Sequence, residues 1–248
     1  MMARHFLDLD GAQVLPTPGL QLVEQAVVDV LACDAMGVIH GPAGLGKTFA
    51  VERALAGRGA VGCWSTFPSR PTMRLVAASL FEQLTGSPAG RGSRFVLMDQ
   101  VIEELSTRRR VVVVDEAQRL NTECIEFLRH LHDHPHTRFA LLLVGGDTAW
   151  NVLSREPMLR SRVYRRVRFE ALSPEQVCAL IGEFHPIYAG VDRGLLLFID
   201  EHFAHGNLRD WAAFTQTAAK LCAGHDQPVI DERAARNAFA LHSGGVDP

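Results

Sequence analysis

Met36-Gly-Val-Ile-His40-Gly41-Pro-Ala-Gly44-Leu-Gly46-Lys47-Thr48 is the stretch of sequence that decides the fold. Its second half is a complete GxxxxGK(S/T) pattern, whose glycines permit a tight turn that points backbone N–H groups at phosphate oxygens. Residues 36–40 have the apolar run of a short buried strand, and residues 48–55 have the apolar spacing of a helix. Strand, loop and helix therefore follow one another in the order that a phosphate-binding loop requires.

Lys47 strengthens the case for this loop. Lys47 and Lys220 are the only lysines among 25 basic residues, so an ammonium at the position that contacts the β and γ phosphates is hard to attribute to chance. We expect Thr48 to coordinate Mg²⁺ through its hydroxyl. ATP and Mg²⁺ are thus the predicted cofactors. The loop residues expected to contact the nucleotide are Gly41, Pro42, Ala43, Gly44, Leu45, Gly46, Lys47, Thr48 and Phe49.

A second nucleotide feature is the stretch Arg110-Val-Val-Val-Val-Asp115-Glu116-Ala-Gln118. Four consecutive valines are typical of a parallel strand that is buried on both faces. Asp115, at the carboxyl end of this strand, is expected to hold Mg²⁺ through water, and Glu116 to accept a proton from the attacking water as a general base. The alternative is a strand that ends in a solvated acidic turn. The phosphate loop upstream favours the nucleotide site.

Composition limits the other possibilities. A chain of 248 residues with 47% hydrophobic content can bury one large core, or a large and a small one. The net charge of −3 disfavours a wholly basic coat for nucleic acid but allows a local arginine-lined surface. Five scattered cysteines without a CxxC pair indicate a reducing compartment. No apolar run approaches the roughly 18 residues of a membrane span, and no signal peptide is evident, so we expect a cytoplasmic protein without a membrane partner.

Strand and helix patterns alternate up to about Leu172. Further strands are expected at residues 60–64, 111–114, 139–144 and 163–169, and helices at 19–33, 72–84, 95–107, 121–134 and 148–155. After Leu172 only helices are expected, at residues 174–187, 193–204, 207–223 and 231–241. The pattern predicts the α/β class, with a parallel sheet flanked by helices and then a small all-helical domain. The expected domains are residues 1–172 and 173–248.

Four features together resemble the AAA+ ATPases, a class of P-loop NTPases, over nearly the whole chain. They are the phosphate loop, the acidic strand end, the arginine-bearing segment 160–168 and Gly206-Asn-Leu-Arg209 in the helical region. Within that class, residues 37–48, residues 113–118 and Leu128-Arg-His-Leu-His-Asp133 followed by Leu143-Val-Gly145 are similar to the transposition helper ATPases. That group includes the phage Mu B protein and the TnsC and TniB proteins.

The resemblance implies roles for residues outside the two nucleotide motifs. Arg162, or alternatively Arg160, occupies the position of an arginine finger that acts on the γ phosphate of a neighbouring subunit. Arg209 matches the second sensor of these ATPases. In the family this sensor is an arginine of the helical domain, called the lid, and its side chain points toward the bound phosphates. Asp147 is the candidate for the first sensor, with Thr148 as the alternative. A plain solvated basic face is the competing interpretation of the arginines in segment 160–168.

The resemblance also implies partners. Relatives assemble as rings or helical filaments, and loops after the second strand and after the acidic strand follow the backbone of double-stranded DNA without reading its sequence. The matching candidates here are Arg70, Arg74 and Arg119. These arginines could instead cap helices or pair with surface acids. The expected partners are copies of the same chain, non-specific duplex DNA, and a transposase or related recombination protein.

The expected function is therefore an oligomeric, Mg²⁺-dependent ATPase that binds DNA and acts in target selection and transposase recruitment or activation. Two alternatives stay open. One is an ATPase of the ExeA type, which serves secretion machinery and shares the Asp-Glu-Ala-Gln signature. The other is an initiator-type or signalling-type nucleotide switch that acts on a protein partner.

Alternating histidines at residues 130–136 raise the separate question of a zinc site. His130 and His134 have the i, i+4 spacing of helical zinc ligands. Structural zinc usually takes four ligands in closed geometry, and Pro135 breaks a helix at this point. We therefore expect a solvated helix end here and no metal.

Overall fold

The computed structural model describes residues 7–56, 58, 62–90 and 92–243. Contacts between Cα atoms divide the chain into two compact units. Unit 1 contains residues 22–43 and 50–169, and unit 2 contains the described parts of residues 3–21, 44–49 and 170–248. The domains expected at residues 1–172 and 173–248 stay a prediction.

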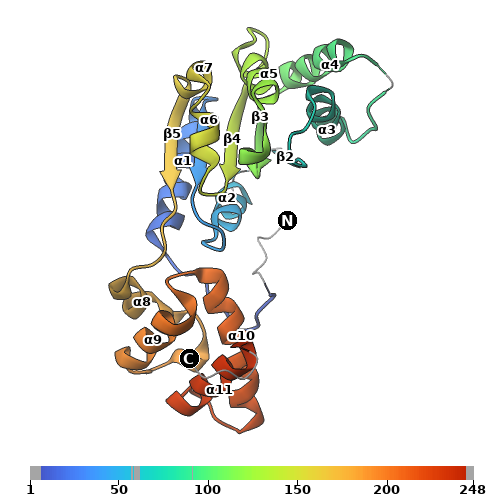
Figure 1. Cartoon of the computed structure of the whole chain (residues 1–248). Coiled ribbons are helices and arrows are strands. Elements are labelled where there is room, and N and C mark those ends of the chain that lie inside the picture. Colours follow the sequence, from blue (N-terminus) through green and yellow to red (C-terminus); the bar gives the residue numbers. More distant parts are fainter. Residues whose placement is uncertain (1–6, 57, 59–61, 91, 244–248) are drawn as a thin grey trace. The chain divides into compact units, whose positions relative to one another are not determined.

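A five-stranded parallel sheet with strand order β2-β3-β4-β1-β5 forms the centre of unit 1 (Figure 1). The strands are β1 (Met36–His40), β2 (Gly62–Thr66), β3 (Arg110–Asp115), β4 (Phe139–Gly145) and β5 (Val163–Arg168). β3 and β4 are rich in valine and leucine, and nearly all of their residues are buried because helices cover both faces of a parallel sheet. The predicted fold class is confirmed. The first two residues of the strand expected at 60–64 lie outside the described residues.

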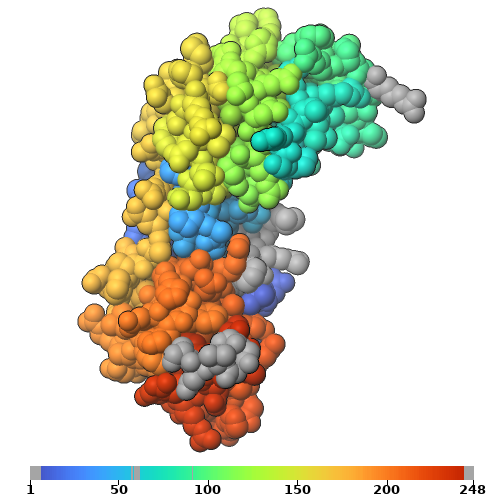
Figure 2. Space-filling view, viewed as in Figure 1, coloured from blue at the N-terminus to red at the C-terminus, as the bar shows by residue number. Residues whose placement is uncertain are grey.

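One helix precedes the first strand, and the others connect the strands. They are α1 (Pro18–Ala32), α2 (Lys47–Ala56), α3 (Met73–Thr85), α4 (Arg94–Thr107), the short 3-10 helix η1 (Ala117–Arg119), α5 (Thr122–Asp133), α6 (Ala149–Leu153) and α7 (Pro157–Arg160). Thr72, Ser93 and Asn121 start α3, α4 and α5, since each side chain accepts a backbone N–H three residues further on. α3 and α4 lie side by side at one end of unit 1 (Figure 2). Their apolar faces join α5 and the sheet in one core.

The part of unit 2 from residue 170 to residue 243 is mainly helical. It contains α8 (Pro174–Leu180), the 3-10 helices η2 (Ile181–Glu183) and η3 (Pro186–Tyr188), α9 (Arg193–Ile199), the π-helical segment η4 (Asp200–Ala204), α10 (Leu208–Gly224) and α11 (Glu232–Ser243). The prediction of a single helix over residues 174–187 is wrong, because α8 ends at Leu180 and two short 3-10 helices follow it. Pro186 disfavours a helical conformation at the residue before it, and His185 is extended, with φ −152°. No helix within the described ranges is long and apolar enough to span a bilayer.

The core of unit 2 contains two leucines from the beginning of the chain. Leu9 and Leu15 are buried together with aromatic side chains such as Trp211 and Phe214. Backbone hydrogen bonds hold the same segment, since Gln13 N donates to Phe184 O at 2.7 Å. The sequence pattern assigns these residues to the first domain because two isolated leucines without periodicity do not indicate which core they join.

A tight turn before α10 organises unit 2. Gly206 has φ 70°, and a Cβ atom at this position would collide with the backbone of Leu172. The Gly206 N–H donates to Asp200 Oδ1 at 2.7 Å, and Trp211 Nε1 donates to the same oxygen at 3.0 Å. One buried carboxylate thus fixes both the turn and the first turns of α10.

We predict that Gly206→Ala lowers the free energy of unfolding by about 2 kcal/mol or more, because alanine adds both left-handed strain and a backbone collision. Gly224→Ala is the matched control. Gly224 ends α10 with open space around its Cα, so the same change there is expected to stay within about 0.5 kcal/mol. Urea unfolding followed by circular dichroism measures both. Equal effects of the two variants would contradict the role given to the Gly206 turn.

Candidate functional site

The three glycines of the phosphate loop adopt backbone conformations that other residues avoid. The φ angles are 143° at Gly41, 83° at Gly44 and 89° at Gly46. Gly41 is constrained further, since a Cβ atom there would lie 2.5 Å from the carbonyl oxygen of Phe169. Phe169 N in turn donates to His40 O at 2.7 Å, which joins the loop to the segment after β5. The motif spacing therefore follows from backbone sterics.

The start of α10 lies against the same loop within unit 2. Arg209 N donates to Gly44 O at 2.9 Å, and a Cβ atom on Gly44 would collide with the side-chain amide of Asn207. Asn207 also caps α10, because its Oδ1 accepts the Arg209 N–H at 3.0 Å. The predicted second sensor is thus one hydrogen bond away from the loop backbone. On the other side of the loop, Lys47 begins α2, whose N-terminus favours bound anions.

The two acids after the valine run stand at the carboxyl edge of the sheet. Asp115 is the last residue of β3, and Glu116 follows in a left-handed conformation with φ 56° and ψ 39°. Glu116 N donates to Asp115 Oδ1 at 2.8 Å, so the turn orients the Asp115 carboxylate. β4 separates β3 from β1, and His40 is in register with Gly145. Because the strands are parallel, the acidic turn and the beginning of the phosphate loop lie at the same edge, where open α/β sheets bind ligands.

Glu52 of α2 is a further acid whose charge is coupled to that of Asp115, and it has no role among the sequence predictions. Burial raises the pKa of Glu52, and the negative charge of Asp115 raises it further. Two carboxylates that repel each other in this way favour a cation near them. The only sequence signal for Glu52 is its position four residues after Thr48, on the same face of the helix.

Gln118 is the second residue without an assigned role that the structure brings to this edge. Its Nε2 donates to Glu116 Oε2 at 2.6 Å, and its Oε1 accepts the Gly146 N–H at 2.8 Å. Asp147, the predicted first sensor, has a side chain that is 61% exposed, and its carboxylate lies 4.0 Å from Arg168. The hydrogen bonds therefore connect Glu116 to the turn after β4 through Gln118.

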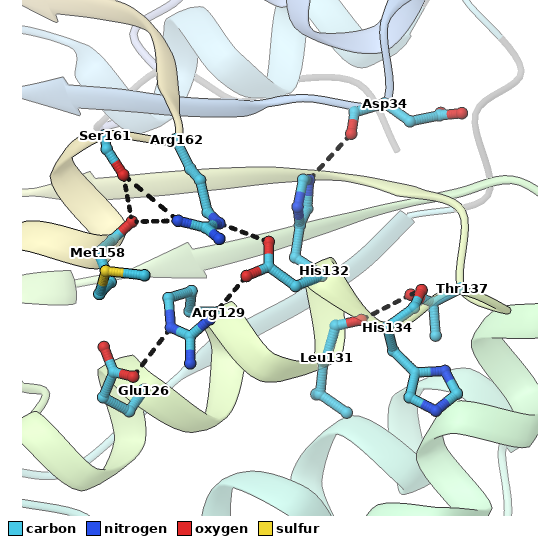
Figure 3. A network of polar contacts seen from close by, with 11 residues as sticks. Asp34, Glu126, Arg129, Leu131, His132, His134, Thr137, Met158, Ser161 and Arg162 are labelled. Carbon is cyan, nitrogen blue, oxygen red and sulfur yellow. Dashed lines mark hydrogen bonds and ion pairs between the residues drawn. The ribbon is translucent and has the colours of Figure 1, made fainter.

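The two finger candidates differ in their surroundings. Arg162 Nε donates to Asp133 Oδ1 at 2.6 Å, and its Nη1 donates to Met158 O at 3.0 Å (Figure 3). The other oxygen of Asp133 accepts from Arg129 at 2.6 Å, so this carboxylate joins α5 to the end of α7. Arg160 is exposed, and among the described contacts its guanidinium has no partner. Arg162 is thus bound within its own subunit, and Arg160 faces solvent.

The predicted DNA-binding arginines lie around the loop after β2. Arg70 is exposed with φ 55°, and its N–H donates to Arg119 O at 3.0 Å. Arg119 lies 3.6 Å from Glu116 in an ion pair, and its Nη1 donates to Phe67 O at 3.4 Å. Arg74 donates to Gly92 O. The structure therefore brings Arg70 and Arg119 together through the backbone, whereas the Arg74 guanidinium is bound near the start of α4.

The histidines at the end of α5 are the remaining candidates from the sequence. Within the described ranges, no group of three or more His, Cys, Asp or Glu residues could hold a metal ion. His132 is not solvated as expected for this helix end. Its Nε2 donates to Asp34 O at 2.9 Å, and its ring packs edge-on against Phe139 at 5.3 Å between centroids. Burial lowers the pKa of His132, and the hydrogen bond with Asp34 opposes part of this shift.

We predict that His132 makes the stability of the protein sensitive to acid. A histidine whose pKa is lowered on folding contributes stability above its unfolded pKa of about 6.5, and this contribution is lost as the pH falls. The difference in free energy of unfolding between the wild type and His132→Gln should therefore be larger at pH 7.5 than at pH 5.5. Urea unfolding at the two pH values measures it. A difference that does not change with pH would contradict the prediction.

Comparisons with known proteins agree with this geometry. Residues 33–153 match a family model described as an AAA domain. No curated protein sequence matches the chain. Among solved structures, Cdc6p from Pyrobaculum aerophilum aligns with a TM-score of 0.72 at 18% identity, covering 92% of this chain and 68% of that one.

Two further structures are similar. The Aeropyrum pernix Orc1 protein, solved in complex with DNA, aligns with a TM-score of 0.67 at 16% identity, covering 91% of this chain and 66% of the Orc1 chain. The Thermotoga maritima RuvB Holliday junction branch migration motor aligns with a TM-score of 0.63 at 15% identity, covering 94% and 72% of the two chains. The chain thus spans about two thirds of the length of the structures it resembles. At these identities the likeness concerns the fold.

Proposed function

We propose, from the match of residues 33–153 to a family model described as an AAA domain, that the protein is a Mg²⁺-dependent, oligomeric P-loop ATPase that binds duplex DNA without sequence preference. The observation that carries the ATPase proposal is the conformation of the loop. Three glycines with positive φ follow β1, and two acids stand at the end of β3 on the same edge of the sheet. This arrangement combines backbone donors for phosphates with carboxylates for a metal and for water.

The residues present have the chemistry that ATP and Mg²⁺ require. The positive φ values of Gly41, Gly44 and Gly46 suit a loop whose backbone N–H groups point at phosphates, and Lys47 adds an ammonium to this loop. Thr48 and Asp115 supply the oxygen ligands that Mg²⁺ prefers. When bound, ATP supplies the phosphoryl group. Glu116 orients the attacking water and takes its proton, and Arg209 reports the nucleotide state to the lid.

Hydrolysis in this proposal needs a neighbouring subunit. An arginine finger has to project from its own subunit with its guanidinium available to the phosphates of another. Arg160 meets this requirement because it is exposed at the end of α7. Arg162 would first have to break its ion pair with Asp133. We therefore assign the finger to Arg160, with Arg162 fixing α7 against α5.

Mixing two inactive variants tests this assignment. Lys47→Ala removes the phosphate ligand but keeps the finger, and Arg160→Ala removes the finger but keeps the loop. Each alone is expected to lower ATP turnover at least about 100-fold, and a mixture should recover part of the activity, because some interfaces then combine an intact loop with an intact finger. Arg162→Ala is the comparison variant, expected to keep more activity than Arg160→Ala. If ATP turnover recovers when Lys47→Ala is mixed with Arg162→Ala but not when it is mixed with Arg160→Ala, the finger is Arg162.

The DNA part of the proposal rests on the arginines around the loop after β2. Arg70 is exposed beside the backbone of Arg119, and both lie near the acidic turn. Guanidinium groups at such a loop bind phosphates whatever the sequence of the bases. The solved structures similar in fold include Orc1 in complex with DNA. That likeness supports the fold and leaves DNA binding by this chain as our proposal.

We further propose that the DNA-bound assembly serves transposition, by marking a target and recruiting or activating a transposase. The support is the local similarity of residues 37–48 and 113–118 to the transposition helper ATPases. The competing functions are a secretion-type ATPase and a nucleotide switch directed at a protein partner. These predict no affinity for DNA.

Fluorescence anisotropy of a labelled non-specific duplex, in ATP with Mg²⁺ and in ADP at two salt concentrations, separates these functions. We expect cooperative binding in ATP that weakens at higher salt. Arg70→Ala with Arg74→Ala should weaken binding about tenfold or more and leave ATP binding intact. Arg53→Ala with Arg236→Ala is the matched control, since it removes the same charge from exposed ion pairs elsewhere. No binding in either nucleotide state would favour the protein-directed functions.

A further inference from the structure

The Gln118 side chain bridges two parts of unit 1 that are far apart in sequence. Its amide N–H contacts the Glu116 carboxylate at 2.6 Å, and its amide oxygen accepts the backbone N–H of Gly146 at 2.8 Å. Both groups of the amide are therefore used, one on each side. The Gly146 carbonyl continues the connection, since it accepts the Ala149 N–H at 3.0 Å and so begins α6.

The glycines after β4 leave room for this bridge. A Cβ atom on Gly145 would lie 2.6 Å from Gln118 Oε1 and 2.6 Å from the Cβ of Ala149. A Cβ atom on Gly146 would lie 3.3 Å from Gln118 Nε2. Both contacts are closer than ordinary packing, so side chains at these positions would push the amide away. Gly145 and Gly146 stand where a polar sensor residue is expected directly after the strand. Their lack of side chains leaves the space that the Gln118 amide occupies.

We propose that Gln118 is a positioning residue for hydrolysis: its amide holds one oxygen of Glu116 and ties it to the turn after β4, so that the other oxygen faces the attacking water. This inference rests on the proposed function, in which Glu116 is the general base. Glu116 needs such a restraint because its side chain is about 41% exposed and its ion pair with Arg119 is long, at 3.6 Å. Without the amide, the carboxylate is free to sample other rotamers, and misplacement of a catalytic group by about 1 Å can cost about 100-fold in rate.

The chemistry of an amide suits this position. A carboxylate at 118 would place two negative charges together, and asparagine is one methylene too short to reach both partners. Methionine has a similar length and volume but donates no hydrogen bond. Gln118→Met therefore removes the bridge and keeps most of the packing.

Steady-state ATP turnover of the full chain, with Mg²⁺ and under conditions that allow assembly, tests the proposal. We expect Gln118→Met to lower kcat by about 10- to 100-fold and to change KM for ATP by less than about twofold, because only the orientation of Glu116 is affected. Gly146→Ala keeps Gln118 but disturbs the contact between the Gln118 amide and the backbone at residue 146. It should lower kcat by a smaller factor. Gln83→Ala, on an exposed part of α3, removes a glutamine outside the site and should leave both constants unchanged.

Two double variants distinguish positioning from a general structural role. If Gln118 acts through Glu116, Glu116→Gln with Gln118→Met is no slower than Glu116→Gln alone, and Gln118→Met with Gly146→Ala is no slower than Gln118→Met alone. Losses that multiply in the first pair would overturn the inference.

A wild-type kcat in Gln118→Met, with Glu116→Gln strongly impaired, would overturn the role of Gln118 and leave the proposed function standing. Full activity of Glu116→Gln, or no turnover in the wild type, would overturn the proposed function and this inference with it. Should Gln118→Met fail to fold by circular dichroism, Gly146→Ala decides, because a wild-type kcat in that variant contradicts the bridge.

Discussion

The parallel register of β3, β4 and β1 is the constraint on which the site of unit 1 depends. It places the residues that follow all three strands at one edge of the sheet, although these strand ends, at His40, Asp115 and Gly145, are widely separated in sequence. Each strand end then needs a sharp change of direction, provided by Gly41, by Glu116 in a left-handed conformation and by the Gly145-Gly146 pair. The left-handed backbone of Glu116, the proposed general base, is a local strain of the kind that collects at functional sites.

Arginine carries nearly all of the positive charge of this chain, and the structure separates the arginines into two groups. Some are bound within the subunit, as Arg162 and Arg129 are by the single carboxylate of Asp133. Others, such as Arg160 and Arg70, are exposed. A carboxylate partner in the same subunit weakens the binding of a guanidinium to an external phosphate, because the internal ion pair has to break before the phosphate can bind. Partner recognition in the proposed function therefore depends on acids such as Asp133 as much as on the arginines themselves.

In unit 2, a buried carboxylate has a comparable organising role. Asp200 accepts hydrogen bonds from the backbone of Gly206 and from Trp211, and this fixes the turn that leads into α10. The next residues contact the phosphate loop through Asn207 and through the Arg209 N–H. Unit 2 thus holds the backbone of the predicted lid sensor next to the phosphate loop.

The sequence by itself determined the fold class, the phosphate loop and the acidic strand end. Each of these features depends on residues that are close together in the chain: the glycine spacing, the valine run and the helix periodicity that follows. It also placed most helices and strands within a few residues, and the roles of Lys47, Thr48, Asp115 and Arg209 remain predictions made at that level. Tertiary structure alone decided which distant groups meet. Examples are the hydrogen bond between Gln118 and Gly146, the ion pair between Arg162 and Asp133, and the burial of Leu9 in the helical core. Each of these contacts joins segments that no sequence pattern links. Only the folded backbone brings such side chains within hydrogen-bonding or van der Waals distance.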